Sequence, residues 1–192
     1  MKNDLPRPAI KPNAINKWIR IKLLSSYIYN IPKNEKTLDL ACGWGFSFDI
    51  NPNFYGVELD DDCVDYCRKR GFNVTKGNLL EPLPFPDEYF DNCFSHDVLE
   101  HFELAEVDVI FKNVNKILSR GGIFMNIIPN RKGYDYGCAL NAGHKHFIIP
   151  AEIQQVAARM GFQYMGAYSA PVPEIINIWF NHAKYVTLCR KL

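Results

Sequence analysis

Histidine and carboxylate side chains gather in two short segments of the chain, "HDVLEHF" and "GHKHF". Four of the five histidines belong to these segments, namely His96, His101, His144 and His146, and the fifth is His182. An imidazole can gain or lose a proton near neutral pH, so each of the four is a candidate general base. Asp97 and Glu100 are further candidates. The alternative is structural, since Glu100 and His101 can be a fold-stabilising pair at a helix start and a loop histidine is often only solvated.

A glycine-containing turn follows the first apolar strand of the chain, in "TLDLACGWGF". Gly43 and Gly45 allow backbone angles and a close ligand approach that side chains would block, and Ala41 is the smallest substitute for glycine. Glu58 ends a second predicted strand in "GVELD", where a carboxylate can accept hydrogen bonds from both hydroxyls of a ribose. Phe48 stands where a third glycine would be, so the pattern favours a nucleoside without a diphosphate over a nicotinamide dinucleotide. A plain tight turn is the structural alternative.

Apolar patterning predicts that strands alternate with helices over most of the chain. Seven strands are predicted, at residues 37–41, 54–59, 73–79, 90–96, 123–129, 162–169 and 185–192. Four helices are predicted, at residues 13–29, 63–71, 103–120 and 150–162. This alternation predicts a mostly parallel sheet with helices on both faces. The last two strands have no helix between them, so we expect them to form an antiparallel edge.

Residues 1–36 form a basic arm ahead of the predicted sheet. They hold eight lysines or arginines against Asp4 and Glu35, a local charge of +6, whereas the whole chain has a net charge of +1. One helical stripe in the arm is apolar and consists of Ile15, Trp18, Ile19, Leu23 and Tyr27. We expect the arm to pack on one α/β domain at residues 37–192. Its charge is typical of a solvated helix face or of a surface that attracts an anionic substrate, nucleic acid or membrane.

The composition is that of a globular protein, with 47% hydrophobic residues among 192. No apolar run reaches the roughly 18 residues of a membrane span, and the first residues lack a signal-peptide core, so we expect a cytoplasmic protein without a membrane span. Six cysteines without paired spacing are expected to be buried thiols, namely Cys42, Cys63, Cys67, Cys93, Cys138 and Cys189. Cys63 and Cys67 share a helical face, but no third ligand lies near them in the sequence, and no metal site is expected.

Several motifs, in the expected order, resemble the class I S-adenosylmethionine-dependent methyltransferases, particularly the small-molecule group of the methyltransferase type 11 kind. "LDLACGWG" is similar to the family's first motif, "LD-x-G-C-G-x-G", with Ala41 in place of the first glycine, and "GVELD" resembles the second motif. "GNLLEPLPFPDEYFDNCFSHDVLEHF", "ILSRGGIFMNIIPN" and "GHKHFIIPAEIQQVAARMGF" are similar to later segments of the family. The likeness covers roughly residues 37–165. It implies a Rossmann-like, doubly wound sheet and S-adenosylmethionine as the cofactor.

The resemblance also implies which residues would hold S-adenosylmethionine. They are Asp39, Ala41, Cys42, Gly43, Glu58, Leu59, Asn78, Leu79 and His96. Residues 41–43 would lie against the methionine part, and Asp39 would support their turn. Glu58 would hold the ribose, and Leu59 would pack on the adenine. Asn78 stands where the family usually has an aspartate near the adenine amino group, and the alternative for Asn78 is an ordinary turn residue.

Methyl transfer from a sulfonium is an in-line displacement, so most of the catalysis can come from holding the nucleophile about 3 Å from the methyl carbon. A general base is optional. We select His101 and His144 as the catalytic candidates, and we expect His144 to be the more exposed of the two because it lies in a loop. His96, at the end of the fourth strand, would border the sulfonium region, and Leu79 would lie beside the adenine.

The acceptor is expected to be a small molecule with an oxygen or nitrogen nucleophile, and nucleic acid is expected to be an unlikely partner. Enzymes of this fold that methylate base amino groups carry an Asn/Asp-Pro-Pro-aromatic motif after the fourth strand, and cytosine C5 enzymes need a Pro-Cys nucleophile, whereas this chain has "SHDV". Residues 130–143 are predicted to form a mobile lid or acceptor wall. Residues 170–185 can cover a substrate, form a dimer face or complete the core. The alternatives are a noncatalytic cofactor-binding protein and a nicotinamide oxidoreductase, and the oligomeric state stays open.

Overall fold

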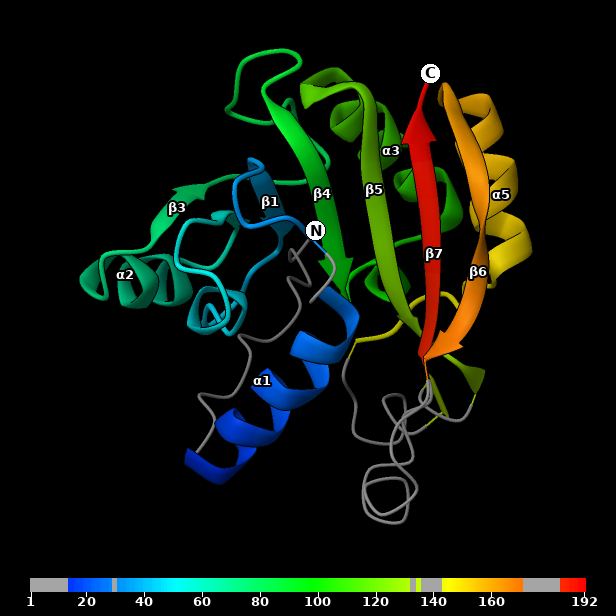
Figure 1. Cartoon of the computed structure of the whole chain (residues 1–192). Helices are drawn as coiled ribbons and strands as arrows, with labels where there is room; N and C mark the ends of the chain where they lie inside the picture. The colour runs from blue at the N-terminus through cyan, green and yellow to red at the C-terminus, as the bar shows by residue number, and fades with distance from the viewer. Residues whose placement is uncertain (1–13, 29–30, 132–133, 136–142, 171–183) are drawn as a thin grey trace, which may run out of the picture.

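A seven-stranded sheet forms the centre of the computed structural model, which describes residues 14–28, 31–131, 134–135, 143–170 and 184–192 (Figure 1). The strands are β1 (Thr37–Leu40), β2 (Tyr55–Glu58), β3 (Asn73–Lys76), β4 (Phe90–His96), β5 (Leu118–Pro129), β6 (Phe162–Ala170) and β7 (Lys184–Lys191). Their order in the sheet is β3-β2-β1-β4-β5-β7-β6. The first five strands pair in parallel, and β7 pairs antiparallel with both β5 and β6. This order confirms the doubly wound α/β sheet with an antiparallel edge.

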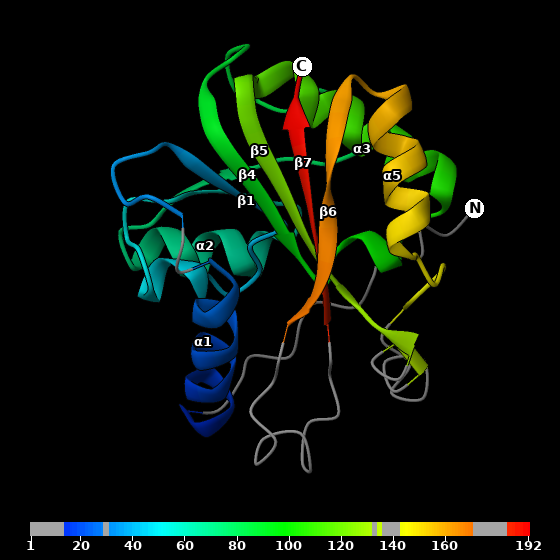
Figure 2. The same cartoon turned by 45° about the vertical axis from the view of Figure 1, so that its right-hand side comes forward.

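Two layers of helices cover the two faces of the sheet. Helices α1 (Ala14–Ile28) and α2 (Asp61–Lys69) lie on one side, and α3 (Leu104–Ile117) and α5 (Pro150–Arg159) lie on the other (Figure 2). The buried apolar side chains accordingly form two clusters, one that includes Tyr27 of α1 and Val64 of α2 and one that includes Phe111 of α3 and Ile153 of α5. Burial on both faces explains why the parallel strands are apolar along their length.

The junction between α3 and β5 differs from the prediction. A helix was expected to continue to Arg120, but α3 ends at Ile117 and β5 begins at Leu118. Leu118 pairs with Phe90 of β4, and its carbonyl accepts a hydrogen bond of 2.7 Å from the Lys191 ammonium group. These contacts with distant parts of the chain start the strand five residues earlier than predicted, and residues 118–120 among them leave the predicted helix.

Helix α1 is held differently at its two ends. The predicted apolar stripe does not face the core as a whole, because Ile15 is 72% and Trp18 is 61% exposed, whereas Tyr27 is buried together with its neighbours Leu24 and Ile28. Among the α1 side chains that the structure describes, the buried ones therefore lie near the end of the helix; the side chains of Ile19 and Leu23 are outside this description. In the first half, the Lys17 ammonium group pairs with a carboxylate oxygen of Asp49 at 3.0 Å, so that an ion pair takes the place of apolar contact.

The cysteines and the helices of the described residues can be compared with the expectations of buried thiols and of no membrane span. Five cysteines are free and buried, namely Cys42, Cys63, Cys67, Cys93 and Cys189. Cys138 lies outside the described residues. Among the helices of the described ranges, none combines the length and the apolar character that crossing a bilayer requires.

Candidate functional site

The carboxyl ends of β1, β2 and β4 meet at one edge of the sheet, close to α1 (Figure 1). The turn that contains Gly43 follows β1, Glu58 is the last residue of β2, and His96 is the last residue of β4. Ligands of open α/β sheets bind at this edge. The topology thus brings together three features that the sequence separates.

A direct hydrogen bond joins the glycine turn to the acidic residue. The Gly43 N–H donates to Oε2 of Glu58 at 2.8 Å. The other carboxylate oxygen, Oε1, accepts from the N–H groups of Leu59 at 2.7 Å and Asp60 at 2.9 Å. Glu58 therefore points toward the turn, and three backbone donors hold its side chain in place.

The backbone of the turn is left-handed at two of its first three residues. Ala41 has φ of 53° and Gly43 has φ of 52°. A Cβ atom built on Gly43 would meet no atom within 4 Å, so one side of this residue is open. Between them, Cys42 is buried and its N–H donates to the carbonyl of Val57 at 3.2 Å, which ties the turn to β2. The backbone of the turn is therefore accessible at Gly43 and is held to β2 through Cys42.

Asp39 lies beneath the turn and is almost completely buried. The Ser47 hydroxyl donates to Oδ2 of Asp39 at 2.6 Å. Burial raises the pKa of Asp39 to about 8, and the nearby charge of Glu58 acts in the same direction, while the hydrogen bond from Ser47 opposes the shift. Asp39 thus contacts the segment that follows the turn, and its support of the cofactor turn stays a prediction.

The three residues predicted to surround adenine differ in exposure and in hydrogen bonding. Leu59 is 38% exposed, which is a large value for a leucine next to a buried strand. Leu79 is buried in the core cluster. Oδ1 of Asn78 accepts a hydrogen bond from the Leu80 N–H at 3.0 Å, and its Nδ2 lies 3.5 Å from Oε1 of Glu81. Asn78 thus stabilises a turn, which is the role of the structural alternative, and its amide N–H groups are only weakly engaged.

His96 and its neighbour Asp97 lie at the end of β4. Burial lowers the pKa of His96 to about 4 against the opposing charge of Asp97, whose carboxylate is 3.6 Å from Nε2 of His96. Asp97 also forms an ion pair with the Lys184 ammonium group, and its φ is 54°. Lys184 was not selected from the sequence. The one feature of the sequence that could have pointed to Lys184 is its place as a basic residue at the start of the apolar strand "KYVTLC".

His101 and His144 are neighbours in space although they belong to different segments. Their rings are edge to face, with centroids 5.0 Å apart. The loop of His144 is held to the short helix η2 (Leu99–His101) because the Glu100 carbonyl accepts the N–H groups of Lys145 at 2.8 Å and His146 at 3.3 Å. The His144 side chain is 8% exposed, and both histidines are half-buried residues.

The environment of these histidines favours the neutral imidazole. Burial lowers the pKa of His101 and is also the main cause of the lowered pKa of His144, where the neighbouring His101 adds to it. Glu100, between them in space, is buried, and its pKa lies well above the ordinary value because of burial and the nearby Asp97 carboxylate. By contrast, His146 turns away and pairs with Glu152 at 3.0 Å.

Parts of the predicted acceptor wall lie outside the described residues. These parts are residues 132–133, 136–142 and 171–183, and His182 is among them. Within the remainder, the Tyr134 ring lies 5.2 Å from the ring of His144, so this segment borders the histidine pair.

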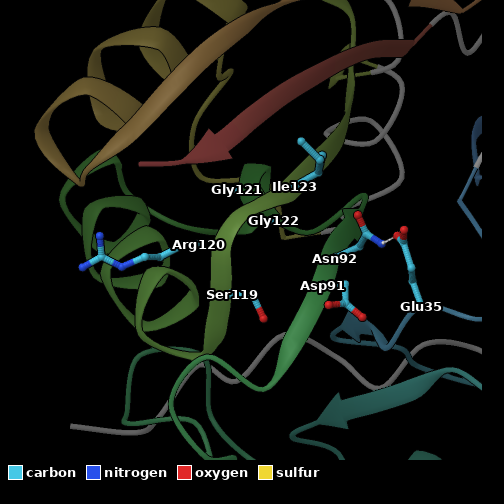
Figure 3. A pocket seen from close by; sticks show the side chains of 8 residues that line it. All are labelled: Glu35, Asp91, Asn92, Ser119, Arg120, Gly121, Gly122 and Ile123. Atoms are coloured by element: carbon cyan, nitrogen blue, oxygen red, sulfur yellow. Dashed lines mark hydrogen bonds between the residues drawn. The ribbon is translucent and has the colours of Figure 1, made fainter.

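A pocket is present at the opposite edge of the sheet, where β4 and β5 begin (Figure 3). It is lined by Glu35, Asp91, Asn92, Ser119, Arg120, Gly121, Gly122 and Ile123. The Asn92 amide donates to Oε2 of Glu35 at 2.6 Å across it. None of the sequence-predicted site residues lines this pocket, and it is separate from the edge that holds Gly43 and Glu58.

Comparisons with known proteins agree with this arrangement. Residues 38–126 match the model of a methyltransferase domain family. The chain is 25% identical over 100 residues to a tRNA (carboxymethyluridine(34)-5-O)-methyltransferase of Arabidopsis thaliana, which covers 51% of this chain and 24% of that protein. It is 27% identical over 149 residues to an mRNA cap guanine-N(7) methyltransferase of Cryptococcus neoformans, which covers 64% of this chain and 23% of that protein. The chain thus spans about a quarter of the length of these curated relatives.

These relatives correct the expectation about the acceptor. The sequence argument favoured a small molecule and disfavoured nucleic acid, but the curated relatives are methyltransferases of tRNA and of the mRNA cap. Absence of the two motifs is no guide to this acceptor, because those motifs belong to enzymes that methylate base amino groups or the C5 carbon of cytosine. The names of the relatives specify other atoms, an oxygen of a modified uridine and N7 of guanine.

The fold has a counterpart among solved structures. An S-adenosylmethionine-dependent methyltransferase of Archaeoglobus fulgidus superimposes with a TM-score of 0.74 at 16% identity, over 91% of this chain and 94% of that one. The sheet order, the Gly43–Glu58 hydrogen bond at the carboxyl edge and the matched domain all point the same way. They show the doubly wound fold of S-adenosylmethionine-dependent methyltransferases, in which residues 38–126, slightly less than half of the chain, match the methyltransferase domain family.

Proposed function

We propose that this methyltransferase acts on a nucleoside of an RNA, with S-adenosylmethionine held between the turn after β1 and the end of β2. The hydrogen bond from Gly43 to Glu58 is the observation that carries the cofactor part of the proposal. The RNA part is supported by the curated relatives, which act on tRNA and on the mRNA cap. A further support is the charge of +6 on residues 1–36, because phosphate groups are attracted to such a surface.

The residues at the carboxyl edge fit the chemical groups of S-adenosylmethionine. A carboxylate offers about four acceptor positions, of which Glu58 uses three for backbone N–H groups, so one remains for a ribose hydroxyl. The open side of Gly43 has room for the methionine part. Leu59 offers an exposed apolar side chain to the adenine, and the weakly engaged Nδ2 of Asn78 can donate to a ring nitrogen.

When bound, S-adenosylmethionine supplies an electrophilic methyl group on a sulfonium. The protein's contribution to an in-line displacement is mainly to hold the acceptor atom on the line of the breaking bond. We place the acceptor against His101 and His144, which lie just beyond the end of β4. A nitrogen such as N7 of guanine carries no proton to be removed, so its methylation would need no base, and a general-base role for either histidine stays a prediction.

Helix α1 supports the proposal by its place as well as its charge. It lies near the carboxyl ends of β1 and β4, and Arg20 and Lys22 are exposed on it (Figure 1). An RNA strand whose nucleoside enters at this edge would pass within reach of these cations. The association would then weaken with salt, because each phosphate contact releases counterions.

The cofactor part is tested by isothermal titration calorimetry with S-adenosylmethionine and its demethylated product. Glu58→Gln is expected to weaken binding about 10- to 150-fold, the equivalent of one charge-assisted hydrogen bond. Glu35→Gln is the matched control, because this glutamate lies at the opposite edge of the sheet (Figure 3). Unchanged binding by Glu58→Gln, or equal losses in both variants, would contradict the cofactor placement.

The RNA part is tested by transfer of a labelled methyl group to total tRNA and to capped RNA, with a mixture of small metabolites in parallel. Incorporation into RNA that falls as salt increases is the expected result. Transfer to the metabolite mixture alone would refute the RNA proposal and leave the cofactor placement intact.

A further inference from the structure

Three side chains that can bind a metal ion converge beyond the end of β4. Glu100 and His101 belong to η2, and His144 belongs to the loop that precedes α5. One ligand atom from each residue lies within 4.8 Å of the other two. Between Nε2 of His144 and Oε1 of Glu100 the distance is 3.9 Å.

The hydrogen bonds of the two imidazoles leave Nε2 of each with a free lone pair. Nδ1 of His101 is 3.2 Å from the carbonyl oxygen of Gly143, and Nδ1 of His144 is 3.3 Å from that of Tyr134. A carbonyl oxygen only accepts, so Nδ1 must carry the hydrogen in both rings. In proteins, histidines that bind metals almost always donate their second ring N–H in this way.

Glu100 brings a carboxylate into this group without an ordinary partner. The residue is 1% exposed, and among the described residues neither of its carboxylate oxygens has a hydrogen bond of ordinary distance and angle, although the neighbouring Asp97 carboxyl group can share a proton with it. A buried carboxylate that lacks partners is costly unless it is protonated or paired with a cation. Lys184, whose positive charge acts on Glu100, already forms an ion pair with Asp97.

The backbone segments that carry these side chains are held together before any ligand arrives. The backbone carbonyl of Glu100 accepts two N–H groups from residues 145 and 146 of the histidine loop. The histidine loop and η2 are therefore held against each other, and the three side chains lie near one another without an ion.

The geometry points to a binding site for a divalent transition-metal ion, such as Zn²⁺ or Mn²⁺, formed by Glu100, His101 and His144. Two imidazoles with one carboxylate are a common set of three protein ligands for such ions. Ligands about 2.0–2.1 Å from a tetrahedral ion are about 3.3 Å apart, so the present spacing of up to 4.8 Å needs a closure of about 1.5 Å. Nε2 of His144, a ring nitrogen of His101 and the Glu100 carboxylate would then bind the ion, and this ligand role would replace the predicted general-base role of the two histidines.

The experiment uses the full chain after treatment with a chelator. Zn²⁺ and Mn²⁺ are titrated by calorimetry, and Co²⁺ serves as a spectroscopic probe because its visible absorption reports coordination by nitrogen. We expect one ion per chain. We also expect the melting temperature to rise by roughly 5–10 °C at a metal concentration about 100 times Kd.

Two variants and a matched control locate the ion. Glu100→Gln keeps the shape of the side chain but removes its charge, and His144→Ala removes a ligand; each is expected to weaken binding at least about tenfold. His146→Ala is the control, since this histidine lies in the same loop and pairs with Glu152 instead. The control should bind the ion as the wild type does.

Several results would overturn the site. They are the absence of binding for all three ions by the wild-type chain, unchanged affinity in Glu100→Gln, and a loss in His146→Ala as large as in His144→Ala. If His144→Ala fails to fold, Glu100→Gln decides the matter, because glutamine matches the neutral form that burial favours for Glu100 and should leave the metal-free melting temperature unchanged or higher. None of these measurements uses S-adenosylmethionine or RNA. The metal site can therefore be refuted while the proposed function holds, and the proposed function can be refuted while the metal site holds.

Discussion

Replacing Gly43 by alanine is expected to weaken cofactor binding in addition to a modest destabilisation of the fold. Gly43 has φ of 52°, and a Cβ atom there would meet no protein atom within 4 Å. The folded state is therefore strained only by the left-handed backbone, which costs an alanine about 1–2 kcal/mol. In a domain of this size the melting temperature would fall by roughly 2–8 °C.

The magnitude for binding follows from the open side of the same residue. If the methionine part of S-adenosylmethionine lies there, an added methyl group overpacks the complex, which typically costs about 1–3 kcal/mol. The Kd for S-adenosylmethionine should accordingly rise about 5- to 150-fold. This loss comes in addition to the loss of stability and is measured by calorimetry at a temperature where the variant is fully folded.

Two other glycines are controls for this prediction. Gly71, after α2, has φ of 79° and also has no atom near its Cβ position. Gly71→Ala should lower the melting temperature as Gly43→Ala does and leave the Kd unchanged. A Cβ on Gly45 would lie 2.8 Å from the Cys67 sulfur and 3.2 Å from the Phe48 ring, so Gly45→Ala should lose more stability than either. Wild-type binding by Gly43→Ala, or an equal loss by Gly71→Ala, would refute the placement of the cofactor.

Three further predictions concern charge and packing. Asp39 has a pKa of about 8 in the folded state and an ordinary value of 3.8, so between pH 3.8 and pH 8 the folded state binds more protons than the unfolded state. The free energy of unfolding should therefore fall by up to about 1.4 kcal/mol per pH unit as the pH rises through this window. Urea unfolding should show that this slope is absent in Asp39→Asn. Phe111→Ala should cost about 3–5 kcal/mol in the same assay, because this buried ring packs against Phe124 at 4.8 Å. Reversing the charge of both Arg20 and Lys22 to glutamate should weaken RNA binding and flatten its dependence on salt without changing the Kd for S-adenosylmethionine.

Strand and helix types were predictable where the local signal and the tertiary contacts agree. Strand β4 has the predicted bounds, Phe90–His96, and α5 begins at the predicted Pro150. The end of α3 was not predictable, because its last residues suit a helix and a strand equally. Pairing of Leu118 with Phe90 and a hydrogen bond from Lys191 decide in favour of the strand. Likewise, nothing local reveals that Ile15 and Trp18 stay exposed while the end of α1 is buried.

The two halves of the candidate site differ in how far the sequence determines them. The cofactor half depends on the ends of β1 and β2, which are adjacent parallel strands, so the contact between Gly43 and Glu58 follows from the topology. The acceptor half depends on side chains from η2, the loop before α5 and β7. Asp97 meets Lys184, and His101 meets His144, only after the sheet has formed.

This difference explains why the class of enzyme was predicted correctly and the acceptor was not. Main-chain geometry at a strand end binds a nucleoside almost independently of the side chains around it, so motifs for the cofactor persist in sequences of low similarity. The acceptor is selected by the shape and charge of loops, and two absent motifs exclude only the atoms that those motifs serve. The histidine pair and the buried Glu100 lie in this acceptor half. An ion bound between them would add a fixed positive charge there and would favour an acceptor with anionic or oxygen groups.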